Sequence, residues 1–417
     1  MKILFIHPFL PYPLTSGGHQ ALYNGIKAVK EDVDITLVYE AVDNEAHRKA
    51  REEFQKQMPN VRLKPLLHQP YTLTKEEIIR GKIRNLYRKI FRIKDRNKGI
   101  TAHDSSLWWK RTITPTCSEW IEHIYNVSHA EHYDIIQIEM PWRISDIYAM
   151  PESSKVIFVH HELGFIRRKL EIENVEDNPY LQVCKRFVDD NELAQLNKYD
   201  AVITLSPVDK QKLIDAGVRI PVYSSFAIID IKKPPVPHSG NGKRLVFVGP
   251  EIHAPNIVGI KWFLDKCWNK LLTIDPNYNL DIIGRWTETT QADFIKKYTN
   301  IKFLGFVEDL YSVMKDAIMI VPITIGSGIR MKILEACGRG IPFVSTTVGA
   351  EGIPIKDGEH CLIADDAERF VENIVRLQDS ILCDTLCLSS FEMVKEFFSI
   401  AALRKNRLGI YHDLLVE

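Results

Sequence analysis

The sequence predicts an α/β protein built from two doubly wound parallel sheets. Short apolar runs alternate with amphipathic stretches along most of the chain, which is typical of strands that alternate with helices. Most of these runs are continuously apolar, as expected for strands buried on both faces. A segment rich in proline and glycine at 231–243, IKKPPVPHSGNGK, divides the chain into halves of similar size. We therefore expect two Rossmann-like domains that face each other across a cleft, with ligands bound outside the carboxyl ends of the strands.

The first domain is expected to cover residues 1–230, and the second begins at 244 with RLVFVG and extends to 390. Apolar side chains recur at helical spacing between the runs, for instance over Asn256–Leu272 and Arg330–Cys337. The expected strands are Lys2–Ile6, Ile35–Tyr39, Ile135–Glu139, Val156–His160 and Ala201–Leu205 in the first domain, and Leu245–Val248, Leu280–Ile283, Ile301–Leu304, Ile318–Val321 and Phe343–Ser345 in the second.

The composition is that of an ordinary globular protein, and it narrows the class of partner. The 417 residues include 54 basic and 54 acidic side chains, and this zero balance argues against a polycation that binds nucleic acid. The seven cysteines are scattered, which favours free thiols in a reducing compartment. The apolar run Ile3–Ile6 is too short for a signal peptide, and no run is long enough to span a membrane. We expect a cytoplasmic protein.

A basic stretch between Lys75 and Arg111 departs from this neutral average. It contains twelve basic and four acidic residues, with isoleucines at helical spacing and the pair Trp108 and Trp109 near its end. A basic amphipathic helix with aromatic flanks can lie on an anionic membrane surface, which would make the protein peripheral at the inner face of the cell membrane. The alternative is a solvated helix that packs its isoleucines on the sheet. Both interpretations remain open.

The segment Ile318–Gly352 is the most informative part of the chain. A buried strand is followed by a glycine-containing loop, and a helix is expected to begin near Ile329. Small residues let a backbone approach a ligand closely, and the first turn of a helix can bind an anion. Arg330 and Lys332 add two cations where a diphosphate would need them, and Glu335 could accept hydrogen bonds from hydroxyl groups. The alternative is a surface ion pair between Lys332 and Glu335.

The motifs of this segment together resemble a known family. GSGIRMKILEA, followed by GRGIPFVST and GAEG, is similar to the C-terminal domain of the family 4 glycosyltransferases, which are retaining enzymes of the GT-B fold. Upstream, VFVGPEIHAPNIVGIKWF, LDIIGR, IKFLGFVEDL and YSVMKDAIMIVPI agree with that family in the same order. The N-terminal half agrees more weakly. The resemblance also implies that a helix at 391–417 crosses back onto the N-terminal domain.

The activity that this resemblance implies is transfer of a sugar from a nucleoside-diphosphate sugar to a saccharide or lipid-linked saccharide, as in surface polysaccharide assembly. The anomeric configuration would be retained, and the departing phosphate would help to deprotonate the acceptor. The nucleoside-diphosphate sugar is a substrate, and neither a cofactor nor a metal is expected. The D-x-D sequence at Asp32–Asp34 precedes a strand at the end opposite to the cleft, so we interpret it as incidental.

The donor-binding residues of the family can be placed on this sequence. Glu335 matches the second glutamate of the E-x7-E motif and would bind the ribose, whereas Ser327 stands at the position of the first. The loop Phe306–Asp309 matches the backbone segment that holds the nucleotide base in the family. The loop after the first strand, with Gly17 and Gly18, matches the one that approaches the phosphates. The expected donor-binding residues are Gly17, Gly18, Arg285, Val307, Gly326, Ser327, Gly328, Ile329 and Glu335.

Histidines of the first domain are the expected contacts to the donor sugar. His160 and His161 end a predicted strand where the family has a histidine facing that sugar, and His161 aligns better. Glu139 and His7 end neighbouring strands and are further candidates for the cleft, although a buried salt bridge would explain Glu139 equally well.

Cations of the second domain are expected to stabilise the charge that grows on the departing phosphate. Arg330 and Lys332 look like the residues that bind the diphosphate, with Arg285 as a third candidate. The expected catalytic residues are therefore His161, His160, Arg330 and Lys332.

Three other functions compete with a glycosyltransferase. A nicotinamide-dependent dehydrogenase would use Gly326 and Gly328, but Met331 stands where its third glycine should be. A GT-B sugar-nucleotide epimerase would share the fold and would need acid and base carboxylates that the sequence does not reveal. A nucleotide-sugar-binding protein that has lost catalysis is conceivable because Ser327 replaces a glutamate.

Overall fold

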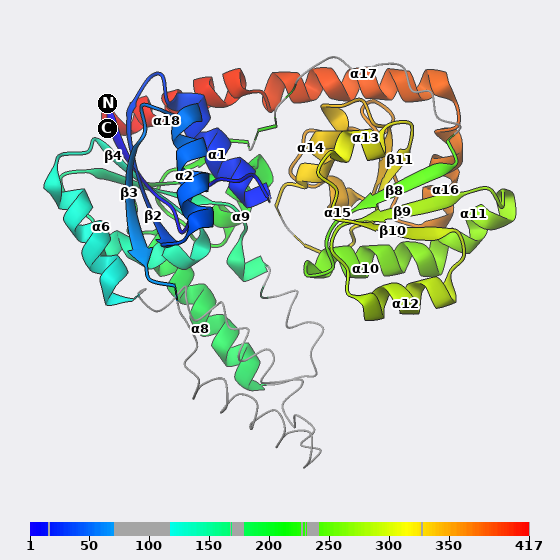
Figure 1. Ribbon diagram of the computed structural model, residues 1–417, viewed down its shortest axis with the longest axis horizontal. Coiled ribbons are helices and arrows are strands. Elements are labelled where there is room, and N and C mark those ends of the chain that lie inside the picture. Colours follow the sequence, from blue (N-terminus) through cyan, green and yellow to red (C-terminus); the bar gives the residue numbers. More distant parts are fainter. Residues whose placement is uncertain are drawn as a thin grey trace, which may run out of the picture.

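The computed structural model describes residues 1–15, 17–70, 117–166, 168, 179–226, 228–229, 231, 242–326 and 328–416. The basic segment 75–111, most of the linker 231–243 and Ser327 lie outside these residues. The described chain forms two parallel sheets layered with helices (Figure 1). Among the described residues, no helix combines the length and the apolar character that crossing a membrane requires.

The first sheet contains seven strands in the order β3-β2-β1-β4-β5-β6-β7, and all its pairings are parallel. Its strands are β1 Lys2–Ile6, β2 Asp34–Val42, β3 Arg62–His68, β4 Ile135–Glu139, β5 Lys155–His160, β6 Ala201–Thr204 and β7 Val222–Ser224. The helices between them are α1 Gly17–Val29, α2 Glu45–Gln57, α6 Ser118–Ala130, the 3-10 helix η1 Pro141–Ala149, α8 Pro179–Leu196 and α9 Pro207–Asp215.

The second sheet contains six strands in the order β10-β9-β8-β11-β12-β13, again all parallel. Its strands are β8 Arg244–Val248, β9 Asn279–Ile283, β10 Ile301–Gly305, β11 Ile318–Val321, β12 Phe343–Ser345 and β13 Leu362–Ile363. The helices are α10 Ala254–Phe263, the π-helix η2 Leu264–Trp268, α11 Asn269–Ile274, α12 Glu288–Lys297, α13 Leu310–Met314, α14 Met331–Cys337, α15 Thr347–Ala350, α16 Ala367–Arg376, α17 Ser380–Phe397 and α18 Ile400–Val416.

All ten strands expected from the apolar runs are present, and the three that the sequence did not reveal lie at sheet edges. β3 and β7 are the edges of the first sheet, and β13 is an edge of the second. β3 mixes exposed with partly buried residues and contains Pro65, which an edge strand tolerates. An edge strand is only partly covered, so it needs no continuous apolar run.

Each sheet has a point at which its strand order reverses, between β1 and β4 in the first and between β8 and β11 in the second. Ligands of doubly wound sheets bind at such a point, outside the carboxyl ends of the strands. His7 follows β1 and Glu139 ends β4, while Gly249 follows β8 and Pro322 follows β11. Both domains therefore place candidate residues at the edge where a ligand is expected.

The last two helices connect the domains (Figure 1). α17 packs on the core of the second domain, and α18 returns to the first, where Leu403, Ile410 and Tyr411 join the core. Arg404 on α18 donates two hydrogen bonds to Asp32, of 2.7 and 2.5 Å. The first aspartate of the D-x-D sequence thus helps to hold α18. The returning helix begins at Ile400 and not at the expected residue 391, because α17 continues past that residue.

We expect Ile410→Ala to lower the free energy of unfolding by about 2–5 kcal/mol, because it leaves a cavity between α18 and the first sheet. Ile410 is 4% exposed, whereas Leu415 on the same helix is 42% exposed, so Leu415→Ala is a matched control. Urea denaturation followed by circular dichroism measures both. A loss for Ile410→Ala no larger than that of the control would contradict the docking of α18.

Candidate functional site

The polar residues at the carboxyl edge of the first sheet fall into two groups, because successive side chains of a strand point to opposite faces. His7, Glu139 and His161 lie an even number of positions from the residues of their strands that pack beneath α18, so their side chains share that face of the sheet. His160 lies an odd number of positions away, on the other face. The two neighbouring histidines therefore point to opposite faces of the sheet. Of the two, His161 is the one that shares a face with Glu139.

The Glu139 carboxylate holds the first group together. His161 Nε2 donates to Glu139 Oε2 at 2.6 Å, and Gln137 Nε2 donates to Oε1 at 2.5 Å. His7 Nε2 lies 3.5 Å from Oε1. Burial by itself would raise the pKa of Glu139, but its interactions with His161 and His7 bring that pKa well below the usual range. Glu139 is thus an ionised carboxylate that fixes the imidazole of His161, whose side chain keeps 12% of its surface exposed to a ligand.

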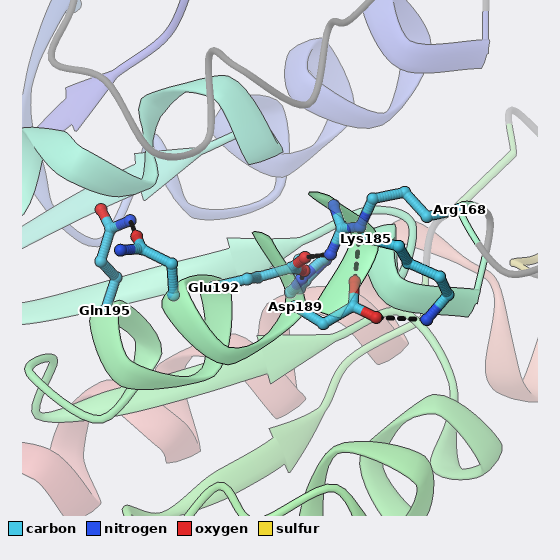
Figure 2. Close-up of polar contacts among 7 residues, drawn as sticks. Arg168, Lys185, Asp189, Glu192 and Gln195 are labelled. Carbon is cyan, nitrogen blue, oxygen red and sulfur yellow. Dashed lines mark hydrogen bonds and ion pairs between the residues drawn. The ribbon is translucent and has the colours of Figure 1, made fainter. Parts of the chain in front are cut away.

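His160 belongs to a buried ion network on the opposite face, part of which is drawn in Figure 2. Its Nε2 lies 3.0 Å from Glu192 Oε1 on α8. Arg168 donates to Glu192 and, at 2.6 Å, to Asp189, which also pairs with Lys185 (Figure 2). The network ties the segment that follows β5 to α8. The structure therefore gives the buried His160 a supporting position, whereas His161 is the one that is partly exposed.

Arg330 organises the glycine loop that follows β11 in the second domain. Its guanidinium donates to the Gly328 carbonyl, and a methyl group at Gly326 would lie 3.2 Å from its Nη2. Gly326 and Gly328 have φ values of 115° and 83°, which glycine adopts without strain. Burial lowers the pKa of Arg330, while carboxylates from both domains act in the opposite direction. Arg330 is thus engaged with the loop that it supports.

Lys332 lies in the first turn of α14, which begins at Met331 rather than near Ile329. Its Nζ donates to Asn256 Oδ1 at 2.9 Å and lies 4.8 Å from the centre of the Phe247 ring. Burial lowers the pKa of Lys332 from its ordinary 10.5 to about 7, and the nearby positive charge of Arg330 adds to this lowering. The Lys332 amine is therefore only partly charged at neutral pH.

The close fit around Asn256 depends on a glycine at the end of β8. A methyl group at Gly249 would lie 2.5 Å from the Asn256 side-chain amide. The Asn256 amide also donates to the Pro250 carbonyl at 3.0 Å, which fixes the oxygen toward Lys332. The loop after β8 and the first turn of α14 are thus joined at the point where the strand order of the second sheet reverses.

Glu335, one turn further along α14, faces the first domain. Burial raises its pKa, while the charge of Arg339 and a hydrogen bond with Gln20 on α1 act to lower it. A methyl group at Gly17 would lie 3.2 Å from Met331 Cγ. The first turn of α1 therefore contacts the start of α14, and a larger residue at position 17 would press against the second domain.

Further contacts between the domains lie close by. Lys212 Nζ pairs with Glu351 Oε1 at 2.6 Å, and a methyl group at Gly328 would lie 3.6 Å from the His161 carbonyl oxygen. Ile329 packs against the cores of both domains. We call the residues gathered at this contact the interdomain site; they are Gly17, Gln20, Gln137, Glu139, His161, Asn256, Gly326, Gly328, Arg330, Lys332 and Glu335.

The remaining expected donor-binding residues lie around this site. Gly18 follows Gly17 in the first turn of α1. Arg285 and Val307 follow β9 and β10, and the Arg285 guanidinium lies 5.6 Å from the centre of the Phe306 ring. They stand along the carboxyl edge of the second sheet. Ser327 lies outside the described residues.

Sequence reasoning did not single out Gln20, Gln137 and Tyr411. Tyr411 on α18 donates its hydroxyl hydrogen to Gln137 Oε1 at 2.7 Å. Gln137 carried a usable signal, because a polar residue two positions before Glu139 in a buried strand must share its face. Gln20 and Tyr411 carried none, since their partners come from segments far away in the chain.

Two Rossmann-like domains arranged in this way define the GT-B fold. Solved structures that share it include sucrose-phosphate synthase from Thermosynechococcus elongatus, with a TM-score of 0.70 and 15% identity over 100% of this chain and 99% of that one. TarM from S. aureus has a TM-score of 0.69 and 11% identity over 98% of each chain. HepE from Anabaena in complex with UDP has a TM-score of 0.64 and 14% identity over 99% of this chain and 100% of that one.

The sequence comparisons concern the second domain above all. Residues 242–380 match the family of glycosyl transferases group 1, which confirms over this segment the resemblance to glycosyltransferases, at the level of this broader group. An uncharacterized 44.6 kDa protein in the cps region of Klebsiella pneumoniae is 25% identical over 163 residues. That alignment spans 37% of this chain and 42% of the length of its relative.

The titration of Lys332 tests the environment of its amine. Since its pKa in the folded protein is near 7, the folded state has lost a proton that the unfolded chain still holds up to about pH 10. The contribution of Lys332 to the free energy of unfolding should therefore increase as pH rises from 7 towards 10. We expect one ¹³Cε-lysine NMR signal to titrate near pH 7, and Lys332→Met to remove it. A Lys332 signal that titrates only near pH 10 would contradict this environment.

Proposed function

We propose that the protein is a retaining glycosyltransferase that moves a sugar from a nucleoside-diphosphate sugar to a saccharide or lipid-linked saccharide in surface polysaccharide assembly. The observation that carries the proposal is Lys332, an enclosed amine that is held by Asn256 where the strand order of the second sheet reverses. It lies within the segment that matches the glycosyl transferases group 1. The solved complex of HepE with UDP-glucose and the cps-region relative support it.

In this proposal Lys332 binds the diphosphate of the donor. An anion beside the amine would raise its pKa again, so donor binding at pH 8 takes up a proton. The restored positive charge then lies where negative charge grows on the departing phosphate, and such electrostatic stabilisation is usually the largest catalytic contribution. Arg330 adds positive charge nearby and keeps the glycine loop in shape.

The rest of the donor is held from both domains. Glu335 accepts hydrogen bonds from the ribose hydroxyls, and Gly17 allows α1 to approach the phosphates closely. His161 uses Nε2 for Glu139, which leaves Nδ1 to bond a hydroxyl of the donor sugar. Both Glu139 oxygens are already engaged, so this carboxylate is a poor nucleophile. Retention would then come from attack by the acceptor on the face that the phosphate leaves.

Nucleotide binding to a Lys332→Met variant is the sharpest test of the donor site. A thermal-shift screen of nucleoside diphosphates first identifies the base, since a ligand of the native state raises its stability. Calorimetry should then show that Lys332→Met weakens binding of that diphosphate by about ten- to a hundredfold, because a charge-assisted hydrogen bond is lost. Lys261→Met, at an exposed lysine of α10, is the control and should bind normally. Equal affinity in both variants would refute the assignment of Lys332.

Turnover separates a glycosyltransferase from the two alternatives that remain. A transferase releases the nucleoside diphosphate. An epimerase converts the sugar of the donor into its epimer without net release of the nucleoside diphosphate, and an inactive protein binds the donor and does neither. The inactive protein is kept as an alternative because Ser327 stands where the family has a glutamate. Assays with and without EDTA test the proposed independence from metal.

A lipid-linked acceptor would bring the protein to a membrane, and the basic segment 75–111 is the proposed contact. We expect the protein to sediment with vesicles that contain phosphatidylglycerol and to ignore neutral vesicles. Replacing Arg84, Arg88 and Arg92 with glutamine should cost about 1 kcal/mol of binding free energy for each residue. Equal sedimentation of the wild type and this variant would contradict the membrane contact.

A further inference from the structure

A chain of hydrogen bonds connects the returning helix α18 to the histidine of the interdomain site. Tyr411 donates to Gln137 Oε1 at 2.7 Å, Gln137 Nε2 donates to Glu139 Oε1 at 2.5 Å, and His161 Nε2 donates to Glu139 Oε2 at 2.6 Å. Tyr411 and Gln137 are each 1% exposed and Glu139 is 3% exposed, so water does not compete for these bonds. The chain spans four residues on three elements, α18, β4 and the end of β5.

We propose that Tyr411 and Gln137 are positioning residues for His161, which rests on the proposed contact between His161 and the donor sugar. Tyr411 fixes the side-chain amide of Gln137, Gln137 fixes the carboxylate of Glu139, and Glu139 fixes the imidazole. Neither Tyr411 nor Gln137 touches the donor in this arrangement. Their effect on the reaction passes through His161.

The direction of every bond in this chain is set by chemistry. Burial raises the pKa of Tyr411 to about 12, so its hydroxyl keeps its proton and donates it. The Gln137 oxygen accepts that bond, which leaves the amide NH₂ facing Glu139. Glu139 is ionised and acts only as an acceptor, so the proton between it and His161 belongs to Nε2.

Loss of the Tyr411 hydroxyl would remove the group that selects this orientation of Gln137. The amide could then turn its oxygen towards the Glu139 carboxylate, and two acceptors would face each other in a buried place. The carboxylate would have to move or find another donor. His161 would lose the partner that keeps its proton on Nε2 and its Nδ1 available to the sugar.

Two other groups, an imidazole and a guanidinium, face the chain and bear on any change with pH. His7 Nε2, from the end of β1, lies 3.5 Å from Glu139 Oε1. Arg407, one turn before Tyr411 on α18, donates to Ser225 Oγ at 2.9 Å, and its charge and a side-chain hydrogen bond with Tyr411 act to lower the pKa of Tyr411 against the effect of burial. Neither group is altered by the substitutions below.

The variant Tyr411→Phe removes one hydroxyl group from this chain, and Tyr199→Phe is its matched control. Tyr199 is 3% exposed, lies in the same domain and donates to the Ile144 carbonyl at 2.7 Å, outside the chain. Tyr411→Phe also loses a side-chain hydrogen bond with Arg407, so its stability should fall at least as far as that of the control. Effects on the His161 ring that the control lacks therefore report on positioning.

We expect ¹⁵N NMR of the His161 ring to show mainly the Nε2–H tautomer in the wild type and a larger share of the Nδ1–H tautomer in Tyr411→Phe. The kcat for donor hydrolysis should fall about tenfold with KM nearly unchanged, since a hydrogen bond to a charged group is weakened. Gln137→Met should have the same effects. The double variant should be no worse than Gln137→Met alone, because both residues act through one bond.

Two results would overturn the proposal. One is a His161 spectrum that is the same in Tyr411→Phe, Tyr199→Phe and the wild type. The other is a changed spectrum with kcat unaltered, which would leave Tyr411 without a role in the reaction. If the wild type turns over no donor at all, the proposed function fails, and the NMR comparison still decides whether Tyr411 positions His161.

Discussion

The structure depends on the buried negative charge of Glu139. A carboxylate removed from water is stable only when other groups compensate it, and Glu139 receives a hydrogen bond on each oxygen and a nearby imidazole. These partners come from β4 itself, from the end of β5 and from the end of β1. The carboxylate thus fixes how the carboxyl ends of three central strands are arranged, at the point where the strand order reverses.

Lys332 is the opposite case in the second domain, a partly buried amine. Among the described residues it donates to the neutral side-chain amide of Asn256 rather than to a carboxylate, and burial of its charge lowers its pKa to about 7. A group held in this way gains most when an anion arrives. The domains therefore bring together an acid–histidine pair whose charge is compensated and an amine bonded, within the described residues, to a neutral amide; the proposed donor would supply a negative charge to this amine.

Much of the fold could be predicted from the sequence, and the reason is the double burial of parallel strands. β11 is a continuous apolar run, and β4 is apolar apart from Gln137 and Glu139; every residue of both strands is buried, and their bounds agree with the expectation. β3 was missed because an edge strand with Pro65 and exposed residues carries no such run. The helix after the glycine loop begins at Met331, later than the start expected near Ile329, since Arg330 turns its side chain back to the loop.

The site could be predicted only as far as local patterns reach. Strand alternation distinguishes His161 from His160, and a likeness to known motifs points to Lys332 and Glu335. The partners that decide their chemistry are Asn256, Gln20 and Tyr411, which lie far away in the chain. Only the folded protein shows that Asn256 holds Lys332 or that Tyr411 reaches Gln137.

The return of α18 has a consequence for the order in which the protein matures. Chains fold from the N-terminus as they leave the ribosome, and the first sheet is complete long before α18 is made. Until the whole second domain has been translated, the nascent first domain lacks Tyr411 and the surface that covers Gln137 and Glu139. With His161 in its proposed role, the first domain acquires a correctly positioned histidine only after the second domain has been translated, so an incomplete chain does not contain the complete proposed site.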